Sequence, residues 1–278
     1  MGGMIKLSIS VVCYQTPSHF LDSLAESLVL AINTLFLHRP DSQISLYFID
    51  NSRDTKDSSD VCRHIGHRLV DQNISVQLVS GHGNIGYGRA HNLIIDKIDS
   101  DYHLILNPDV TLEHDALHKA LAAISLKSNT KILSPFVASP TGEKQFLCKS
   151  YPSVLILLVR GLSLPKLQSL FLRRLSQYEM HDLSESEPTE CPMLLSGCFM
   201  LLDSEAFKAV DGFDEKYFLY FEDFDLSLRI SKLGTLVYDP QVKITHAGGN
   251  TGSKGLWHVF RFLESGFKFF NTHGWQWF

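Results

Sequence analysis

The sequence predicts an α/β fold built around a mostly parallel central sheet. Short runs of apolar, β-branched residues alternate with longer segments whose apolar residues recur at helical spacing, which is typical of βαβ units. Of the 278 residues, 44% are hydrophobic and 20% charged, so the chain can bury a sizeable core and is not a disordered protein. Strands are expected at 5–13, 44–49, 74–79 and 102–106, and helices at 20–37 and 90–98.

Polar residues in this first half follow the expected strands. Tyr14 follows the first strand, Asp50 the second, a glycine-rich loop the third and Asp109 the fourth. In open parallel sheets, ligands bind outside the carboxyl ends of the strands. We therefore expect a binding site at this edge of the sheet.

The second half is less regular. The expected elements are a strand within 191–202, helices at 204–210 and 224–233, strands at 235–238 and 242–245, and a terminal helix at 256–270. Gly234 is expected to cap the helix that precedes it.

Composition excludes several classes of protein. The net charge of -5, from 25 basic and 30 acidic residues, disfavours a duplex nucleic-acid binder. Five cysteines without a CxxC pair fit neither a zinc ribbon nor a disulfide framework and favour a reducing compartment. The longest apolar run, Val154–Val159, is far shorter than the roughly 20 residues of a membrane-spanning helix, so a soluble or peripheral protein is expected.

Two neighbouring segments depart from the average composition. Tyr151–Tyr178 carries four bases and no acid, whereas Glu179–Glu190 carries five acids. Leucines at helical spacing on both sides of Pro165 predict a pair of amphipathic helices. Such a basic pair indicates contact with a membrane surface or a partner, and packing on the core with solvated bases fits equally well.

The C-terminal tail offers a similar choice. Its aromatic residues suit either a lipid headgroup region or the core side of the final helix. They run from Trp257 to Phe278 and are interleaved with Lys254, Arg261 and Lys268.

The segment Gly81–Gly86 matches the GxGxxG pattern of dinucleotide-binding loops. However, it follows the third strand rather than the first, and the next strand ends in Asn107-Pro108-Asp109 instead of an acid placed for a ribose hydroxyl. A plain glycine turn is the other interpretation. The pattern alone is weak support for an NAD-binding protein.

Asp109 and His246 are candidate metal ligands. A carboxylate at a strand end suits a hard divalent cation, although an aspartate there also suits a helix cap. His246 follows a short strand beside glycines and would complete a metal site with Asp109. A lone histidine is more often structural.

Glu222, Asp223 and Asp225 crowd the start of an expected helix, after the aromatic residues of 218–221. Acids at a helix N-terminus are stabilised by the helix dipole, which is a structural reason for their presence. A carboxylate walled by aromatic rings also has its pKa raised by desolvation, as a general base requires. Asp225 and Arg229 are spaced for an i,i+4 ion pair.

Several segments occur in a fixed order along most of the chain, from residue 4 to residue 275. They are Ser8–Tyr14, Phe48–Ser52, Gly83–Asn92, Asn107–Val110, Ser196–Met200, Gly212–Glu215, Glu222–Leu226 and His246–Gly249. Together they resemble family 2 glycosyltransferases with the nucleotide-sugar-binding GT-A fold. Within that family, the pattern is most similar to bacterial rhamnosyltransferases of surface-polysaccharide synthesis, which use dTDP-L-rhamnose.

The resemblance implies a domain organisation. One transferase domain would occupy 4–250, with a donor-binding half at 1–110 and an acceptor half at 111–250. The acceptor half would contain the amphipathic insert at 151–190. A C-terminal helix with aromatic residues would follow at 251–278.

The resemblance also implies roles for individual residues. Asp223 would be the catalytic base with Glu222 beside it on the acceptor side, and Asp50 would hydrogen-bond N3–H of the pyrimidine. Asp109 and His246 would hold Mg²⁺ or Mn²⁺ on the diphosphate. The other donor-binding positions would be Tyr14, Asn84, Gly86, Tyr87, Arg89 and Asn107. Asn107 stands where many relatives have aspartate, which removes one negative charge from the metal site.

The implied reaction transfers L-rhamnose from dTDP-rhamnose to a polyprenyl-diphosphate-linked or growing glycan, with inversion to an α-linkage. In-line displacement needs a base on the acceptor hydroxyl and stabilisation of the leaving diphosphate, so one aspartate and one metal site suffice. The implied location is cytoplasmic, at the inner face of the plasma membrane, with peripheral membrane contact and no nucleic-acid partner. The alternatives are another hexose from a UDP-sugar, an NAD-binding oxidoreductase, and an inactive binding module.

Overall fold

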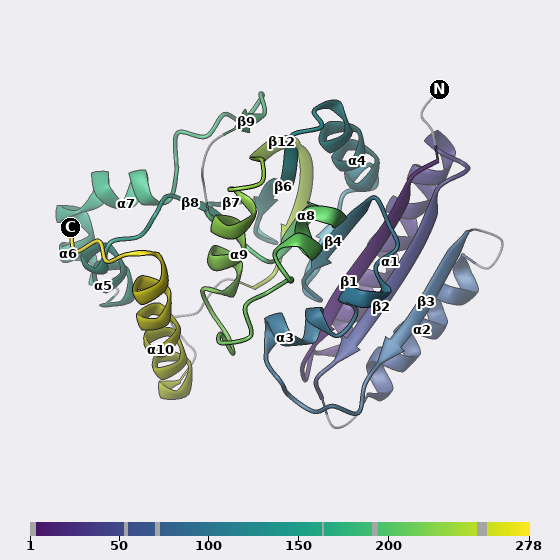
Figure 1. The fold of residues 1–278 in the computed structure, drawn as a ribbon, viewed down its shortest axis with the longest axis horizontal. Coiled ribbons are helices and arrows are strands. Elements are labelled where there is room, and N and C mark those ends of the chain that lie inside the picture. Colours follow the sequence, from purple (N-terminus) through teal and green to yellow (C-terminus); the bar gives the residue numbers. More distant parts are fainter. Residues whose placement is uncertain (1–3, 53–54, 70–72, 163, 191–193, 249–254) are drawn as a thin grey trace.

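The N-terminal half forms the parallel sheet that its alternating segments predict (Figure 1). Strands β1 (Lys6–Cys13), β2 (Gln43–Asp50), β3 (Ile74–Val79) and β4 (Tyr102–Leu106) lie in the order β3-β2-β1-β4, and all neighbours are parallel. Cys13 pairs with Asp50, so β1 and β2 end side by side. The computed structural model describes residues 4–278 except 53–54, 70–72, 163, 191–193 and 249–254.

Helices connect these strands. They are α1 (Ser18–His38), α2 (Lys56–Arg68) and α3 (Tyr87–Asn92), the last followed by a 3₁₀ turn at Ile95–Lys97. The expected helix at 20–37 is confirmed, whereas the one expected at 90–98 begins earlier and breaks into the 3₁₀ turn. The sequence did not predict α2, because it buries only Ser58, Val61 and Ile65 and so shows a weak apolar period.

Beyond β4 the sheet is mixed rather than parallel. Strand β11 (Phe199–Asp203) lies antiparallel between β4 and β6 (Thr130–Ala138). Strand β12 (Thr235–His246) runs parallel to β6, and β5 (Val110–Leu112) pairs antiparallel with its end. The two strands expected at 235–238 and 242–245 are therefore one strand, with an irregularity between Asp239 and Lys243.

Short strands flank this sheet. β7 (Lys144–Gln145) pairs with β6 and β9 (Thr189–Glu190) pairs with β12, while β8 (Cys148–Lys149) and β10 (Leu194–Leu195) form a separate two-stranded sheet. The strand expected within 191–202 is thus divided between β10 and β11, and Cys191 lies outside the described residues.

The helices of the second half are α4 (Ala116–Leu126), α5 (Val154–Leu162), α6 (Pro165–Leu170), α7 (Leu172–Tyr178), α8 (Ser204–Ala209), α9 (Glu222–Ile230) and α10 (Leu256–His273). The expected basic pair is three short helices, because the chain turns again at Phe171. The expected cap at Gly234 is wrong, since α9 ends at Ile230. Glycine is required there because a Cβ would overlap the Asn129 carbonyl.

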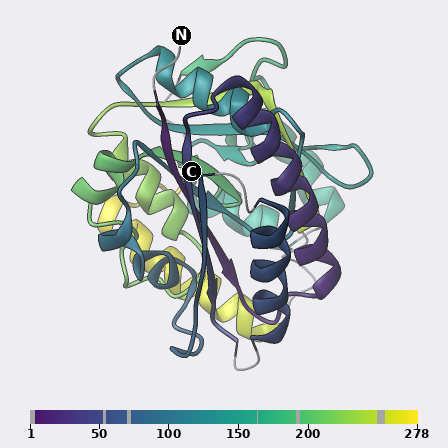
Figure 2. The same cartoon turned by 90° about the vertical axis from the view of Figure 1, so that its right-hand side faces the viewer.

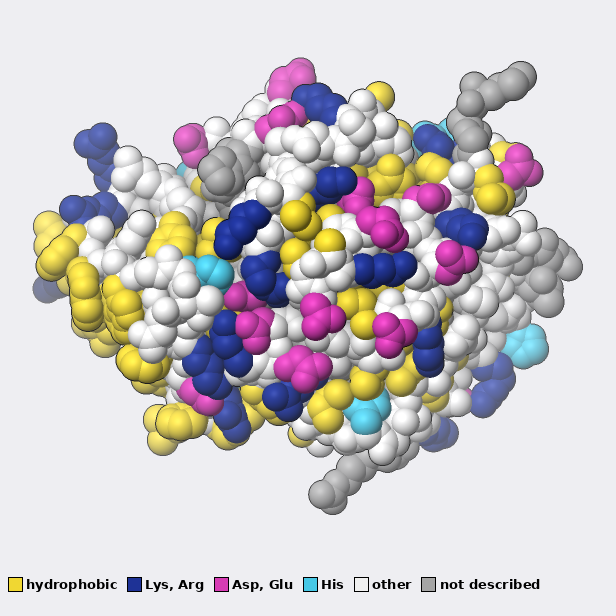
Figure 3. Space-filling model, viewed as in Figure 1, with side chains coloured by type: hydrophobic (Ala, Val, Ile, Leu, Met, Phe, Trp, Pro, Cys, Tyr) yellow, Lys and Arg dark blue, Asp and Glu magenta, His cyan; other side chains and the backbone are white. Residues whose placement is uncertain are grey.

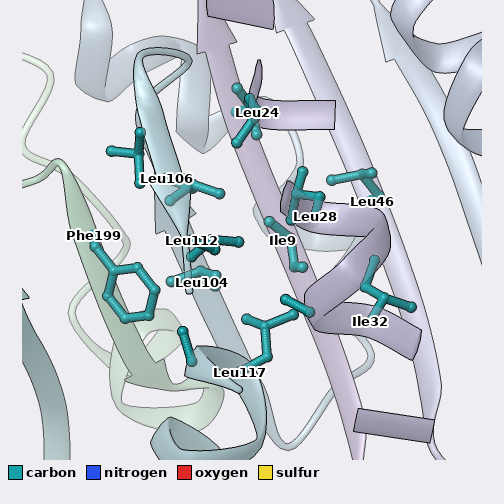
Figure 4. Packing of buried hydrophobic residues seen from close by; sticks show 14 of the residues in the cluster. Ile9, Leu24, Leu28, Ile32, Leu46, Leu104, Leu106, Leu112, Leu117 and Phe199 are labelled. Atoms are coloured by element: carbon teal, nitrogen blue, oxygen red, sulfur yellow. The ribbon is translucent and has the colours of Figure 1, made fainter. Parts of the chain in front are cut away.

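Helices cover both faces of the sheet (Figure 2), and an apolar layer lies between the helices and the sheet on each face. Helices α1, α2 and α4 pack on one face, and α3, α8 and α9 pack on the other. In the first layer, Leu24, Leu28 and Ile32 of α1 point at the sheet (Figure 4). Burying each such side chain stabilises the fold by about 1.5–3 kcal/mol.

Helix α1 is long and apolar enough to cross a membrane by length and composition, and among the described residues no other helix is. Half of it is buried in the protein, and core helices pass the same test. Its buried side, which includes Leu21, Leu24, Leu28, Ile32 and Leu35, faces the sheet. These contacts mark α1 as a core helix.

Candidate active site

The carboxyl ends of β1 and β2 hold Asp50 next to the glycine-rich loop. Asp50 is buried, and one of its oxygens, Oδ1, accepts a 2.8 Å hydrogen bond from the amide of Ser52. The neighbouring Asn51 ties this turn to the loop, donating to the Gly86 carbonyl at 3.1 Å and accepting from His82 at 2.8 Å. Tyr14 lies half exposed at the end of β1.

Gly86 packs the glycine-rich loop against the segment that precedes the acidic residues. Its φ of 97° is left-handed, and a Cβ there would lie 2.6 Å from the Phe218 carbonyl oxygen. The next amide, that of Tyr87, donates to the same carbonyl at 3.1 Å. Only glycine meets both requirements, so Gly86 joins the donor half to the loop before α9.

Tyr87 links three parts of this crevice. Its hydroxyl lies 2.9 Å from Oδ1 of Asn107 and 2.8 Å from the Gly197 carbonyl oxygen, and its one proton is shared between these two acceptors. Burial and then the nearby charges of Glu222 and Asp223 raise its pKa well above the usual value, so it stays a neutral donor. The structure therefore brings Tyr87 and Asn107 together with the acidic pair.

Asn84 and Arg89 lie at the exposed rim of the same loop. The Asn84 side chain accepts from the amide of Gly86 at 3.2 Å. Arg89 donates through Nε to the Glu215 carbonyl at 2.9 Å, and its Nε lies 3.7 Å from a carboxylate oxygen of the same residue. Arg89 is thus anchored to the loop before α9.

Two strained residues precede the acidic pair. Tyr220 and Phe221 have φ values of 71° and 65°, a left-handed conformation that costs aromatic residues of order 1–3 kcal/mol each. Packing holds Phe221 in place, with its ring centroid 5.0 Å from that of Phe262 and 5.3 Å from that of Phe269. This turn sets the direction in which α9 begins at Glu222.

Asp223 is held as a carboxylate of raised pKa. Its Oδ2 accepts from the amide of Gly197 at 3.0 Å and its Oδ1 from the amide of Phe224 at 2.9 Å. Burial raises the pKa of Asp223 to about 6, although these hydrogen bonds stabilise the carboxylate and act to lower the pKa. A carboxylate of this pKa is ionised at neutral pH and is basic enough to accept a proton from a hydroxyl in a transition state.

Glu222 lies beside Asp223 but is more deeply buried. Burial, followed by the charge of Asp223, raises its pKa well above the usual value. Its Oε2 is buried and, within the part of the chain that the structure describes, has no hydrogen-bond partner. The charged form of Glu222 is therefore disfavoured by burial and by its charged neighbour.

Asp109 and His246 come together although 136 residues separate them in the sequence, because β12 pairs with β5 and places His246 opposite Val110. Asp109 Oδ1 lies 3.5 Å from His246 Nε2. Burial opposes ionisation of Asp109, but His246 and backbone amides outweigh it, so its pKa stays below the usual value. Asp109 is charged at neutral pH.

Gln145, which the sequence did not single out, orients His246. Its amide nitrogen donates to the carbonyls of His246 and Gly248, at 2.9 and 3.4 Å. Its oxygen therefore faces Nδ1 of His246, at 3.1 Å, and accepts a hydrogen bond from it. This contact turns Nε2 toward Asp109, where it is the nitrogen available to a metal.

Gly248 leaves room beside these two groups. A Cβ there would overlap Oδ2 of Asp109 and lie 3.1 Å from Nε2 of His246. A carboxylate, an oriented imidazole and an open space fit Mg²⁺ or Mn²⁺, although no third histidine, cysteine or acid joins them among the described residues. Gly249, the last residue of this motif, lies outside the described residues.

No protein-family model matches the sequence. Curated relatives were found, however, and they include an N-acetylglucosaminyl-diphospho-decaprenol L-rhamnosyltransferase of Mycobacterium tuberculosis, 31% identical over 185 residues, which are 62% of this chain and 59% of that protein. The rhamnosyltransferase WbbL of Escherichia coli is 26% identical over 235 residues, 78% of this chain and 80% of WbbL. The chain thus spans under two thirds of the mycobacterial protein.

Solved structures share the fold. A GalNAc-T7 structure with UDP, GalNAc and Mn²⁺ superposes with a TM-score of 0.60 at 16% identity, over 89% of this chain and 44% of the other. The mannosyltransferase PcManGT of Pyrobaculum calidifontis, with GDP-Man and Mn²⁺, gives 0.56 at 14%, over 88% of this chain and 58% of the other. This chain has the GT-A glycosyltransferase fold.

In this GT-A fold, the candidate site lies at the carboxyl ends of the parallel strands, as the sequence predicts. The expected resemblance to bacterial rhamnosyltransferases is confirmed by the curated relatives. Gln145 and Asn51 are additions that the structure makes to the GT-A site. Gln145 lies in no motif, whereas Asn51 lies within the expected segment Phe48–Ser52 but was given no role. Gly197 was part of an expected motif, but its contact with Asp223 required the structure.

Proposed function

We propose that the chain is an inverting glycosyltransferase that transfers L-rhamnose from dTDP-rhamnose to a lipid-linked or growing glycan. The observation that carries this proposal is the placement of one base, Asp223, and one candidate metal pair, Asp109 and His246, around the crevice of a GT-A fold. The curated relatives support rhamnose as the sugar and a polyprenyl-diphosphate-linked acceptor as the substrate class.

Asp223 is the proposed catalytic base. Its carboxylate accepts the proton of the acceptor hydroxyl as that oxygen bonds to the anomeric carbon from the face opposite the diphosphate. The bond from the anomeric carbon to the diphosphate breaks, and inversion of a β-linked donor gives an α-glycoside. The amides of Gly197 and Phe224 keep the carboxylate in place throughout.

The donor-binding side of the crevice is proposed to use the residues at the ends of the parallel strands. Asp50 would hydrogen-bond the pyrimidine and Tyr14 would flank it, while Asn84, Gly86, Tyr87, Arg89 and Asn107 would surround the diphosphate and the sugar. Asp109 and His246 would hold Mg²⁺ or Mn²⁺, which when bound would offset the charge that develops on the leaving diphosphate. The GT-A structures that contain Mn²⁺ support a divalent metal.

Glu222 is proposed to line the acceptor side. Because burial favours its protonated form, Glu222 would be able to donate a hydrogen bond to an acceptor oxygen as well as to accept one. A membrane-embedded acceptor would require the protein to work at the inner face of the plasma membrane. Transfer of another hexose from a UDP-sugar is the alternative that shares this machinery.

The test compares nucleotide-sugars directly. The purified protein is assayed with Mn²⁺ and a short-chain polyprenyl-diphosphate glycan, using dTDP-rhamnose, UDP-glucose, UDP-galactose and UDP-N-acetylglucosamine as donors. We expect turnover with dTDP-rhamnose and at least a hundredfold loss in Asp223→Asn, since general-base catalysis contributes about 10²–10⁴-fold. Asp96→Asn, at an exposed carboxylate, is the matched control.

Turnover with only a UDP-sugar would replace the proposed donor. Full activity in Asp223→Asn would remove the proposed base. Binding of NAD without binding of dTDP would contradict the whole proposal.

A further inference from the structure

Helix α10 braces the loop that precedes the acidic pair. Its inner face buries Ser265, Gly266, Phe269 and Phe270, and Phe269 packs on Phe221. Ser265 Oγ donates to the Leu219 carbonyl at 2.8 Å, and Lys268 Nζ donates to the Lys216 carbonyl at 2.9 Å. One side of α10 is therefore committed to the active-site loop.

The opposite side of α10 is apolar and uncovered. Positions three or four residues apart share one face of a helix, and five such positions form a stripe that is more than half exposed. They are Leu256 (88%), Val259 (53%), Phe260 (63%), Leu263 (60%) and Phe267 (58%). Within the described part of the chain, the Trp275 ring contacts Phe267 edge-on, with 5.6 Å between the ring centroids. All five side chains of the stripe nevertheless remain more than half exposed.

Helices α5–α7 extend this apolar surface. The chain end after α10 is fixed to α5, since the amides of Val154 and Leu155 donate to the carbonyls of Gln276 and Trp277 at 2.8 and 3.2 Å. Hydrophobic side chains gather over this end of the molecule in Figure 3, where Figure 1 places α5–α7 and α10. Exposed members are Leu158, Leu162, Leu164, Leu170, Leu172, Trp277 and Phe278.

The cations of this surface come from α6 and α7 rather than from α10. Lys166, Arg173 and Arg174 are exposed, and no ion pair holds them among the described residues. In α10, by contrast, Arg261 and Lys268 both pair with Glu264, at 2.7 and 2.8 Å. The C-terminal tail, which was expected to supply both aromatic and basic residues, therefore supplies mainly aromatic side chains to this surface. Its third base, Lys254, lies outside the described residues.

We propose that this surface docks on an anionic phospholipid bilayer. The docking surface comprises the exposed stripe of α10, the exposed residues of α5–α7 and the last two residues of the chain. Contiguous exposed apolar side chains mark an interaction site, and aromatic and leucine side chains beside unpaired bases match the boundary between acyl chains and negative headgroups. An acidic protein partner or a second copy would also cover apolar residues, and the test separates these occupants.

The hollow between α5, α6–α7 and the chain end repeats this chemistry on a small scale. Its walls combine apolar side chains with two guanidinium groups, which suits a lipid phosphate and the start of its acyl chains. The lining residues are Leu155, Leu170, Phe171, Arg173, Arg174 and Phe278. Because α10 also braces the loop before Asp223, docking would hold the active site at a fixed height above the bilayer. The use of this arrangement for a lipid-linked acceptor rests on the proposed function.

The experiment measures binding of the full chain to vesicles by co-sedimentation. Wild-type protein is expected to bind vesicles that contain phosphatidylglycerol and to bind pure phosphatidylcholine vesicles much less. The triple variant Phe260→Ser/Leu263→Ser/Phe267→Ser is expected to lose at least tenfold in affinity. The variant Lys166→Gln/Arg173→Gln/Arg174→Gln is expected to lose about fivefold per charge, and the residual binding should depend less on salt.

Matched controls lie on other elements. Leu37→Ser/Leu126→Ser removes two leucines that are each 83% exposed, on α1 and α4. Arg68→Gln/Lys232→Gln/Lys243→Gln removes three exposed bases. Both controls are expected to bind vesicles as wild type does, and circular dichroism confirms that every variant is folded.

Three results would overturn the docking surface: no binding of wild type to anionic vesicles, equal losses in the controls, or a dimer in light scattering that the α10 variant alone disrupts. Measuring vesicle binding and catalysis separately distinguishes failure of the docking surface from failure of the proposed function. Loss of transfer to a soluble acceptor with vesicle binding intact would contradict the proposed function. Transfer without vesicle binding would contradict only the docking surface.

Discussion

The backbone amide of Gly197 donates a 3.0 Å hydrogen bond to Oδ2 of Asp223. Gly197 begins the approach to β11, and its carbonyl also accepts from the hydroxyl of Tyr87. A Cβ at Gly197 would lie 3.3 Å from the Tyr87 ring and 3.6 Å from Cβ of Asp223. Glycine thus lets the base and the tyrosine close around one backbone unit.

The first prediction is a pH profile. Because burial raises the pKa of Asp223 to about 6, the base is protonated and inactive at lower pH and ionised above it. We expect kcat/KM to rise about tenfold per pH unit below 6 and to reach a plateau above 7. Initial rates with saturating Mn²⁺ at each pH measure this, and a midpoint near 4 would show that Asp223 is solvated.

The second prediction concerns stability. The folded state binds the Asp223 proton more tightly than the unfolded chain does, so stability falls as pH rises from about 4 to about 6 and stays reduced above that. Asp223→Asn removes this cost, which is at most about 3 kcal/mol for two pKa units. We expect its Tm to exceed that of wild type at pH 8 and to match it near pH 4.

Asp96→Asn supplies the control, since Asp96 is an exposed carboxylate and its Tm is compared with that of wild type at the same two pH values. A Tm difference for Asp223→Asn that does not change with pH would contradict the burial of this charge. The comparison uses thermal unfolding of folded variants and needs no substrate.

Much of the donor half could be predicted because its signals are local. Strands β1 to β4 are short segments rich in apolar and β-branched residues, and a parallel sheet brings the residues after them to one edge. Asp50, Asp109 and the glycine loop were therefore placed correctly at this edge. Helix α2 and the antiparallel strand β11 lack such a signal. The amphipathic period of α2 is weak, and the direction of β11 depends on the strands that pack beside it.

Contacts between distant residues could not be predicted from patterns. Gln145 reaches His246 across 101 positions, and β7 carries it there only because that strand pairs with β6. The strained turn at Tyr220 and Phe221 is also invisible in the sequence, which shows aromatic residues and no glycine. Both features depend on tertiary packing, which holds a local conformation that the local sequence does not favour by itself.

The third prediction separates backbone strain from close contact in the glycine loop. Gly86→Ala places a methyl group 2.6 Å from the Phe218 carbonyl at a φ of 97°, whereas Gly83→Ala has a φ of 69° and open space. Gly83→Ala pays about 1 kcal/mol for the left-handed backbone. Gly86 has φ 97° and ψ 168°, a region essentially restricted to glycine, so Gly86→Ala pays about 1–3 kcal/mol for its backbone, and it alone displaces the loop before α9. We expect it to lower kcat at least tenfold and to destabilise the fold by a further 1–3 kcal/mol.

Urea unfolding and steady-state kinetics of the two variants measure this difference. Equal effects of Gly83→Ala and Gly86→Ala on kcat would mean that the contact between Gly86 and Phe218 has no part in arranging the site.

The last prediction tests how His246 is oriented. Gln145 accepts a hydrogen bond from Nδ1 at 3.1 Å and thereby turns Nε2 toward Asp109, where it is available to a metal. Gln145→Leu removes that acceptor, so the other tautomer and other ring orientations become accessible. Loss of such a partner of a metal-binding histidine typically costs 10–100-fold in metal affinity, and we expect a loss of that size for Mn²⁺ in calorimetric titrations with dTDP present.

Gln145→Glu, which keeps an acceptor, should retain more affinity than Gln145→Leu, and Gln77→Leu, at an exposed position on β3, should retain all of it. Wild-type affinity in Gln145→Leu would show that His246 takes no part in binding the metal.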